Sequence, residues 1–362
     1  MSALNGPFAR LLTFATWLTS PLTPDDYLGL IDPLLDARHP AGQVTAVRPE
    51  TAHTSTLTIR PGRGWSGHQA GQYIPVGVEV DGVRHWRTYS LTSPPDRPDG
   101  LLAITVKAVP DGTVSPHLAH RTEPGTVLRL GSAQGDFVLP DTLPSRLLML
   151  TAGSGITPVM ALLRALMSRR PPHPDVVLLH STPSPGDSIF GEELRAMQRK
   201  LSWLTHIEHH TRAQGRITPE EVARHCPDWR ARETFVCGPQ GLLDAAENRW
   251  KRAGLGGRIH VERFRPTPLQ TPGPPGPGGG LVLFTRSGVH ADADASTPLL
   301  AVGEAAGVPM PYGCRRGICF GCLTPLAYGR ARDLRTGELH HGAGQLIQTC
   351  VTAAAGPLAL QA

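Results

Sequence analysis

Short apolar runs separated by turns occupy the first part of the chain. Between about Gly42 and Pro140 they include "STLTIRP", "QYIPVGVEV" with the turn Asp81-Gly82 after it, "HWRTYSLTS", "LLAITVKAV" and "TVLRLGSAQGDFVL". Many short strands with turn residues between them are typical of an antiparallel barrel or sandwich. The pattern predicts an antiparallel barrel or sandwich over residues 43–142.

The pattern changes after about Ser145, where apolar strands alternate with helical periodicity. The run "RLLMLTAGSGITPVMALLRALMSRR" is typical of a strand, a glycine turn and a helix, and "DVVLLHS" and "TFVCGP" are further buried strands followed by helix-like sequence. This alternation favours βαβ units and a parallel sheet. The sequence predicts an α/β domain over residues 143–265.

A proline- and glycine-rich run, "TPGPPGPGGG" from Thr271 to Gly280, marks a boundary because neither residue type builds a core. It predicts a linker over residues 266–280. Beyond it, "LVLFTRSGVHADAD" indicates a hairpin and "TPLLAVGEAAG" a short helix. We therefore expect a third domain over residues 281–362, of α+β class, and a helical extension over residues 1–42.

Composition narrows the class of protein. The 362 residues are 40% hydrophobic, and the net charge of +5 comes from arginines spread along the chain. Without a basic stripe on a known motif, nucleic-acid binding is disfavoured. The N-terminal "FARLLTFATWLTSPL" is too short to span a bilayer and lacks the features of a secretory signal. We expect a cytoplasmic protein, whose N-terminal helix packs on the body or rests on a membrane surface.

Three of the six cysteines lie in "YGCRRGICFGC", from Tyr312 to Cys322. The spacing of Cys314, Cys319 and Cys322 is C-x4-C-x2-C, and Cys350 follows after twenty-seven further residues. This is the ligand pattern of plant-type [2Fe–2S] clusters. The glycines of this stretch, Gly313, Gly317 and Gly321, let the backbone approach a cluster and direct N–H groups at its sulfurs.

A zinc site or a disulfide framework would account for these cysteines less well. Zinc sites favour paired C-x2-C units, and this chain has one such pair. A disulfide framework needs an export signal. The sequence thus predicts a one-electron carrier held by Cys314, Cys319, Cys322 and Cys350, with Cys226 and Cys237 outside the pattern.

Two stretches of the first domain, "RTYSLTS" and "VKAVPDGTVSPHL", together resemble the ferredoxin–NADP reductase superfamily. The resemblance implies that Arg87 pairs with a flavin pyrophosphate, that Tyr89 stacks on the isoalloxazine and that the Ser90 hydroxyl lies near flavin N5. It also implies that the turn from Gly112 to Ser115 offers backbone N–H groups to phosphate. The expected flavin-binding residues are Arg87, Thr88, Tyr89, Ser90, Lys107, Gly112, Thr113, Val114 and Ser115.

The stretch "TAGSGITP" joins a strand to a helix, where a pyrophosphate is favoured. It has the form G-x-G-x-x-P, whereas the dinucleotide fingerprint ends in glycine. In the superfamily this form binds the nicotinamide nucleotide, and the later "CGP" lies beside the nicotinamide ring. The resemblance therefore implies nucleotide binding by Gly153, Ser154, Gly155, Thr157, Pro158, Cys237, Gly238 and Pro239.

The resemblance also suggests catalytic roles for Ser90, Cys237, Glu262 and Phe264. Cys237 would help to position nicotinamide C4 for hydride transfer, although an isolated cysteine is more often a buried structural thiol. In "VERFRP", Glu262 and Phe264 would lie over the flavin, although an aromatic residue at a domain end can simply belong to the core.

The choice between NADPH and NADH depends on the residues after the second strand of the nucleotide domain. Ser181 follows that strand, the next acid is Asp187, and Arg212 and Arg216 follow the next strand. This pattern favours NADPH over NADH. FAD is expected in preference to FMN, although relatives with this domain order include FMN enzymes.

The resemblance covers about residues 43–362 and implies an NAD(P)H oxidoreductase that passes electrons through FAD and a [2Fe–2S] cluster to a separate protein. It implies a β-barrel for the flavin domain and a ferredoxin-like β-grasp topology for the C-terminal domain. The leader "LTSPLTPDDYLGLIDPLLDAR" is similar to that of actinobacterial reductases that serve a membrane stearoyl-CoA desaturase. A membrane fatty-acyl desaturase is the expected acceptor, with peripheral membrane association through it. The alternatives are a Rieske ring-hydroxylating oxygenase, a cytochrome P450 or, in another class, a redox-sensing binding module. Arg315 and Arg316 could steer an acidic partner.

Overall fold

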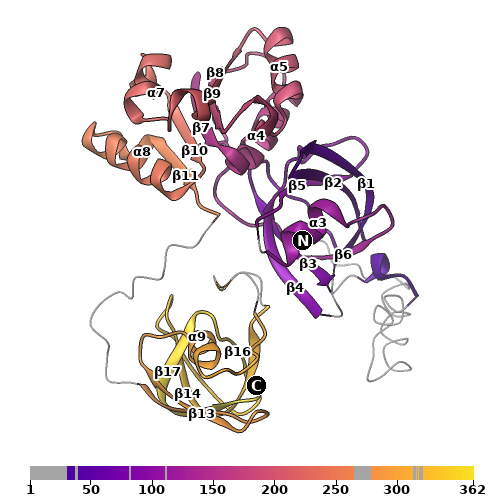
Figure 1. The fold of residues 1–362 in the computed structure, drawn as a ribbon, viewed down its shortest axis with the longest axis vertical. Coiled ribbons are helices and arrows are strands. Elements are labelled where there is room, and N and C mark those ends of the chain that lie inside the picture. The colour runs from indigo at the N-terminus through magenta and orange to yellow at the C-terminus, as the bar shows by residue number, and fades with distance from the viewer. Residues whose placement is uncertain are drawn as a thin grey trace, which may run out of the picture. The chain divides into compact units, whose positions relative to one another are not determined.

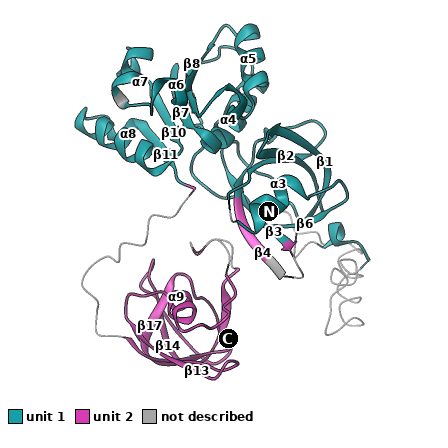
Figure 2. Cartoon of the chain, viewed as in Figure 1, with its two compact units in different colours: residues 1–78, 89–263 teal, residues 79–88, 264–362 magenta. Residues whose placement is uncertain are grey.

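The computed structural model describes residues 31–36, 40–80, 83–110, 112–264, 279–312, 315, 317 and 321–362. The chain divides into two compact units (Figure 2). One comprises Met1–Val78 with Tyr89–Arg263, and the other comprises Glu79–Thr88 with Phe264–Ala362. Much of the predicted leader and most of the predicted linker lie outside the described residues, as do Gly313, Cys314, Arg316 and Cys319.

The first sheet has six strands in the order β4-β3-β6-β1-β2-β5, with α3 (Val114–His120) between β5 and β6 in the sequence (Figure 1). The pairs β1–β2, β1–β6, β2–β5 and β3–β6 are all antiparallel. The predicted antiparallel sheet is therefore confirmed, and its closure into a barrel stays a prediction. The strands are β1 (Ala41–Thr51), β2 (Thr54–Pro61), β3 (Tyr73–Val80), β4 (Val83–Ser90), β5 (Leu102–Lys107) and β6 (Val127–Leu130).

The second sheet is parallel, as predicted, with the strand order β11-β10-β7-β8-β9 (Figure 1). The strands are β7 (Arg146–Ala152), β8 (Asp175–Thr182), β9 (Leu204–His210), β10 (Glu233–Cys237) and β11 (Ile259–Glu262). The helices are α4 (Ile156–Ser168), α5 (Gly191–Lys200), α6 (Thr211–Gln214), α7 (Pro219–His225) and α8 (Gln240–Arg252).

Both faces of the parallel sheet are buried, which explains why its strands are continuous apolar runs. One face packs on α4 and α5, where Leu162 and Leu194 are fully buried. The other face packs on α7 and α8, around Trp229 and Trp250, whose ring centroids are 4.5 Å apart.

The two sheets of the first unit share a core and a polar link. Phe137, beyond β6, packs edge-on against Phe235 of β10, with ring centroids 5.2 Å apart. Arg164 of α4 donates to the backbone carbonyl of Thr92 at 2.7 Å and to both carboxylate oxygens of Glu193. Because Thr92 lies two residues beyond Ser90, these contacts fix the end of β4 against α4.

The C-terminal sheet belongs to the second unit and has the order β13-β12-β17-β14-β15, with β16 paired to β14. The expected hairpin is β12 and β13, and the expected helix is α9, whose Leu299 and Leu300 pack in the core beside Phe284. A further C-terminal sheet domain is thus confirmed, and its β-grasp topology stays a prediction. The elements are β12 (Gly279–Phe284), β13 (Val289–Asp294), α9 (Leu299–Ala305), β14 (Leu323–Asp333), β15 (Leu339–His341), β16 (Leu346–Gln348) and β17 (Thr352–Leu360).

Within the described ranges, none of the helices combines the length and the apolar character needed to cross a bilayer.

Candidate functional site

A row of five paired residues crosses the parallel sheet near the carboxyl ends of its strands. Its members, from one edge of the sheet to the other, are Glu262, Cys237, Thr151, His180 and Glu208. Paired residues of neighbouring strands point to the same face, here the face that packs on α4 and α5. Ligands of open α/β sheets bind at this end of the strands.

The glycine turn after β7 and the segment after β10 are in direct contact. Gly153 has a φ of +55°, which favours glycine. At Gly155, a Cβ atom would overlap the backbone of Cys237 and Gly238. The structure therefore brings the two halves of the predicted nicotinamide site together at the start of α4.

The other predicted residues of this turn stabilise it or continue the helix. The Thr157 hydroxyl donates to the carbonyl of Ser154 at 3.0 Å, so its donor is already engaged. Pro158 is buried in α4, and Pro239 lies directly before α8. Their roles toward the nucleotide stay predictions.

The Cys237 thiol is fully buried. Burial raises its pKa well above the usual value, and the negative charge of Glu262 acts in the same direction. The group is therefore a neutral thiol at physiological pH, unsuited to act as a nucleophile. It can serve as an apolar packing surface, which is compatible with the predicted positioning role.

His180 was not singled out from the sequence, yet it lies in this row directly beside the central Thr151. Its Nδ1 lies 2.8 Å from the Thr151 hydroxyl, and its buried Nε2 has no hydrogen-bond partner within the part of the chain that the structure describes. Burial, with the nearby His206, lowers the pKa of His180 to about 3. The signal in the sequence is a histidine inside the apolar strand "DVVLLHS".

The residues expected to select the nucleotide lie near an acid. Ser181 is buried at the end of β8, while the Arg212 side chain is 73% exposed. Arg212 Nη1 lies 3.9 Å from Asp187 Oδ2, which also accepts a 2.6 Å hydrogen bond from Ser184. Arg216 is exposed. Asp187, which is distant from Arg212 in the sequence but near it in the structure, therefore partly offsets the positive charge of Arg212.

The predicted flavin residues lie on β4 and around the start of α3. Arg87 Nη1 donates to the Trp86 carbonyl at 2.8 Å, Tyr89 is half-buried, and Ser90 is buried. Lys107 is exposed at the end of β5, and Thr88 is half-buried.

One compact turn leads from β5 into α3. The Ser115 hydroxyl accepts from the Val109 N–H, and the Gly112 N–H donates to the Val109 carbonyl, both at 3.1 Å. Thr113 precedes α3, and the Val114 side chain is buried. Val114 can therefore contact a phosphate only through its backbone.

Glu262 ends β11 beside Cys237, and the Phe264 side chain is 40% exposed. Exposure of an aromatic ring shows that it is not part of the core, which leaves it available to a ligand. Placement of either residue over a flavin stays a prediction.

Two of the four predicted cluster ligands lie within the described residues. The sulfur atoms of Cys322 and Cys350 are 3.2 Å apart and buried, too far for a disulfide bond but close enough to bind one metal ion. The Gly317 N–H donates to Cys350 Sγ at 3.3 Å. Thr349 fixes Cys322 by a 3.0 Å hydrogen bond to its carbonyl. This half of the ligand set fits an iron–sulfur cluster.

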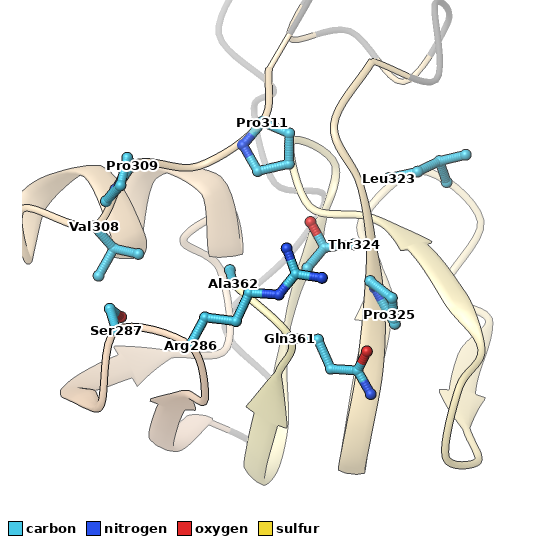
Figure 3. A pocket seen from close by; sticks show the side chains of 10 residues that line it. All are labelled: Arg286, Ser287, Val308, Pro309, Pro311, Leu323, Thr324, Pro325, Gln361 and Ala362. Atoms are coloured by element: carbon cyan, nitrogen blue, oxygen red, sulfur yellow. The ribbon is translucent and has the colours of Figure 1, made fainter.

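A cavity of 460 Å³ opens beside the strand that follows Cys322 (Figure 3). Figure 3 shows the Arg286 side chain extending between Thr324 and Gln361. Its guanidinium makes no ion pair with the described residues, whereas Arg315 binds both carboxylate oxygens of Glu304 at 2.8 and 2.5 Å. The lining residues are Arg286, Ser287, Val308, Pro309, Pro311, Leu323, Thr324, Pro325, Gln361 and Ala362.

Family models match two successive parts of the chain. Residues 51–139 match the oxidoreductase FAD-binding domain, and residues 149–248 match the oxidoreductase NAD-binding domain. Both predicted binding domains are therefore confirmed, and the chain is an oxidoreductase.

Named relatives extend over most of the chain. An "NADPH oxidoreductase" of Mycobacterium tuberculosis is 47% identical over 97% of this chain and 91% of its own length. The "NADH oxidoreductase HCR" of Escherichia coli is 31% identical over 79% of this chain and 86% of its own length. A "Glycine betaine monooxygenase reductase subunit" of Pseudomonas aeruginosa is 28% identical over 76% of this chain and 79% of its own length.

Among solved structures, phthalate dioxygenase reductase, described as modular for electron transfer from pyridine nucleotides to [2Fe–2S], matches with a TM-score of 0.55. It is 22% identical, and the match covers 89% of this chain and 97% of that one, so it shows a shared fold. With the two binding domains and the relative at 47% identity, the chain belongs to the ferredoxin-reductase-like superfamily of FAD- and NAD-binding oxidoreductases.

Proposed function

We propose that this chain is an NAD(P)H reductase that passes electrons through FAD and a [2Fe–2S] cluster to a separate oxygenase-type protein. The observation that carries the proposal is the buried pair Cys322 and Cys350, 3.2 Å apart, in a chain that also has FAD- and NAD-binding domains. When bound, FAD links two-electron hydride transfer to single-electron transfer, and a [2Fe–2S] cluster carries one electron at a time.

In this proposal, residues of the FAD- and NAD-binding parts of the chain bind and orient the flavin and the nucleotide. Arg87 holds the flavin pyrophosphate, Tyr89 packs on the ring and Ser90 lies near its reacting nitrogen. The contact between Gly155 and the backbone of Cys237 shapes the floor on which the nicotinamide rests. The neutral Cys237 thiol excludes water there, and Glu262 and Phe264 complete the site from the end of β11.

NADPH is the proposed electron donor. Arg212 is largely exposed and can reach a 2′-phosphate, and the 47% identical relative is named an NADPH oxidoreductase. Asp187 binds Ser184 and lies near Arg212, so an incoming phosphate competes with a carboxylate that is already partly satisfied. Ser181 and Arg216 belong to the same proposed site.

The proposed acceptor is a protein of the oxygenase type, in line with the relative named as a monooxygenase reductase subunit. Within that class, the N-terminal leader favours a membrane fatty-acyl desaturase, and a Rieske oxygenase or cytochrome P450 is the alternative. Arg286, which has no ion-pair partner among the described residues, suits an acidic docking segment better than Arg315, whose charge is offset by Glu304. A redox sensor would not need two nucleotide-binding domains.

A full-length Cys350→Ser variant tests the proposal. We expect it to lose acid-labile sulfide and the reduction of cytochrome c, while it keeps FAD and the NADPH-dependent reduction of ferricyanide. Cys226→Ser, which replaces a buried cysteine outside the ligand pattern, is the control and should keep all four properties. Equal cytochrome c reduction by the Cys350→Ser and wild-type proteins would show that electrons leave by another route.

A further inference from the structure

The Arg335 guanidinium joins three segments around the cysteines. Nη1 donates to the Gly317 carbonyl at 2.8 Å, and Nη2 donates to Asp333 at 2.6 Å and to the Gln348 side chain at 3.0 Å. Nε donates to the second oxygen of Asp333 at 3.2 Å. The side chain thus connects Gly317, which lies among the clustered cysteines in the sequence, with Asp333 at the end of β14 and Gln348 at the end of β16.

We propose that Arg335 is a positioning residue for the cluster: it holds Gly317 so that its N–H points at Cys350, and it places the positive end of its ion pair with Asp333 toward the cysteines, where it favours cluster reduction. The inference rests on the proposed [2Fe–2S] cluster. Arg335 lies between Cys322 and Cys350 in the sequence, away from both, and the ligand spacing does not single it out.

Gly317 is the element on which Arg335 acts. Its carbonyl accepts from Arg335, and its N–H donates to Cys350 Sγ at 3.3 Å. Its φ of +71° favours glycine, and an added Cβ would overlap the guanidinium and lie 2.9 Å from the Val351 side chain. The orientation of the N–H toward sulfur is therefore coupled to the position of Arg335.

The charge of Arg335 is directed toward the cysteines. Burial of Asp333 acts to raise the pKa of its carboxyl group, but hydrogen bonds from Arg335 hold that pKa below its usual value. Asp333 is therefore ionised and fixes the guanidinium from behind, while Nη1 faces the Gly317 carbonyl. Hydrogen bonds to Asp333 raise the pKa of Arg335, and the charges of Cys350 and Cys322 act in the same direction.

Reduction adds one electron to the cluster and no proton in this proposal. The reduced cluster carries one more negative charge, so a nearby fixed cation favours it, and hydrogen bonds to the sulfurs act in the same direction. Removal of the cation should therefore lower the reduction potential. A residue that only stabilises the turn between β14 and β15 would change the stability of the domain without shifting the reduction potential of the cluster.

The test is anaerobic titration of full-length protein with redox dyes, followed by electron paramagnetic resonance of the reduced cluster. For Arg335→Gln we expect the ratio of reduced to oxidised cluster at fixed potential to fall about tenfold, equivalent to about 59 mV for one electron. Arg335→Lys keeps the charge and should shift the ratio less than about threefold. Arg332→Gln removes an exposed arginine near the end of β14, three residues before Arg335, and should leave the ratio unchanged.

If Arg335→Gln loses the cluster, the same titration of the Asp333→Asn variant tests the inference instead. It removes the counter-charge but keeps an acceptor oxygen, so the ratio should rise. An unshifted reduction potential in Arg335→Gln overturns the inference. If Arg335→Gln binds no cluster, an unshifted reduction potential in Asp333→Asn overturns it. A wild-type protein without iron and acid-labile sulfide contradicts the proposed function, which keeps the two failures distinct.

Discussion

The Thr151 hydroxyl and the His180 ring share a 2.8 Å hydrogen bond beneath the carboxyl ends of β7 and β8. Both side chains are at most 1% exposed, and they are directly paired in register between Cys237 and Glu208. The bond satisfies one ring nitrogen of His180 in a site where water has little access. It therefore stabilises the edge of the sheet that carries the nucleotide-binding turns.

Removing the hydroxyl should destabilise the first unit. Thr151→Val keeps the shape of the side chain but leaves the buried Nδ1 of His180 without its hydrogen-bond partner, at a cost of about 1–3 kcal/mol. We expect a lower thermal midpoint, measured by intrinsic fluorescence of the flavin-bound protein. Thr58→Val, on a half-exposed position of β2, is the control and should change the midpoint little. An unchanged midpoint in Thr151→Val would show that the hydrogen bond contributes nothing.

Burial of His180 also predicts a pH dependence of stability. Its pKa is about 3 in the folded protein and about 6.5 when unfolded, so below pH 6.5 the unfolded state binds a proton that the folded state does not. Stability should therefore fall as the pH drops from 6.5 toward 3, by about 2 kcal/mol at pH 5. His206, whose pKa burial also lowers, adds to the same trend.

His180→Gln tests this assignment because it removes the titrating group from the edge of the sheet. The thermal midpoint of the variant should fall less between pH 7.5 and pH 5 than that of the wild type. The matched variant His225→Gln, at an exposed position at the end of α7, should keep the wild-type slope. Equal slopes in all three proteins would assign the pH dependence to other groups.

The close approach at Gly155 gives a prediction for nucleotide binding. A methyl group there would overlap the Cys237 backbone, so Gly155→Ala must displace the turn or β10. We expect the KM for NADPH to rise at least about tenfold, because loss of about 1.4 kcal/mol of binding energy has that effect. Gly241→Ala, in α8 with open space around the added methyl group, should leave KM unchanged. A normal KM in Gly155→Ala, with normal FAD content, would remove this turn from the site.

These examples also separate what the sequence could and could not predict. Strands such as "RLLML" are evident from apolar runs, and Gly155 and Cys237 are evident from motifs, because both signals are local. The pairing of Thr151 with His180 depends on the order of β7 and β8 and on their register. The approach of Arg212 to Asp187 and the contact of Arg335 with Gly317 join segments that no local pattern connects.

Arg212→Ala should discriminate between the two nucleotides. The KM for NADPH should rise by about tenfold, as expected for loss of a charge-assisted contact worth about 1.5 kcal/mol, while that for NADH changes less than twofold. Steady-state reduction of ferricyanide with each nucleotide measures both values. Arg199→Ala, at an exposed position in the last turn of α5, controls for the general effect of lost positive charge. Equal changes for NADPH and NADH would exclude Arg212 from specificity.

The difference between Arg286 and Arg315 predicts which arginine the acceptor contacts. Arg286 extends into the cavity without an ion-pair partner in the described part of the chain, whereas Arg315 is bound by Glu304 and lies over the Tyr312 ring, 4.7 Å from its centroid. Arg286→Glu should therefore raise the KM for an acidic acceptor protein about tenfold or more. Arg315→Glu should have a smaller effect on that KM, because it removes a charge that is already offset.

Salt provides the control for this comparison, since it screens exposed charges at a Debye length of about 8 Å under physiological conditions. Raising the ionic strength should weaken acceptor reduction by the wild type and bring it toward the Arg286→Glu variant, while ferricyanide reduction stays constant in every variant. Stopped-flow kinetics of acceptor reduction at several salt concentrations measures the effect. If Arg315→Glu raises the KM for the acceptor more than Arg286→Glu does, the ion pair between Arg315 and Glu304 opens on docking. The acceptor then binds around Arg315 instead of at the cavity.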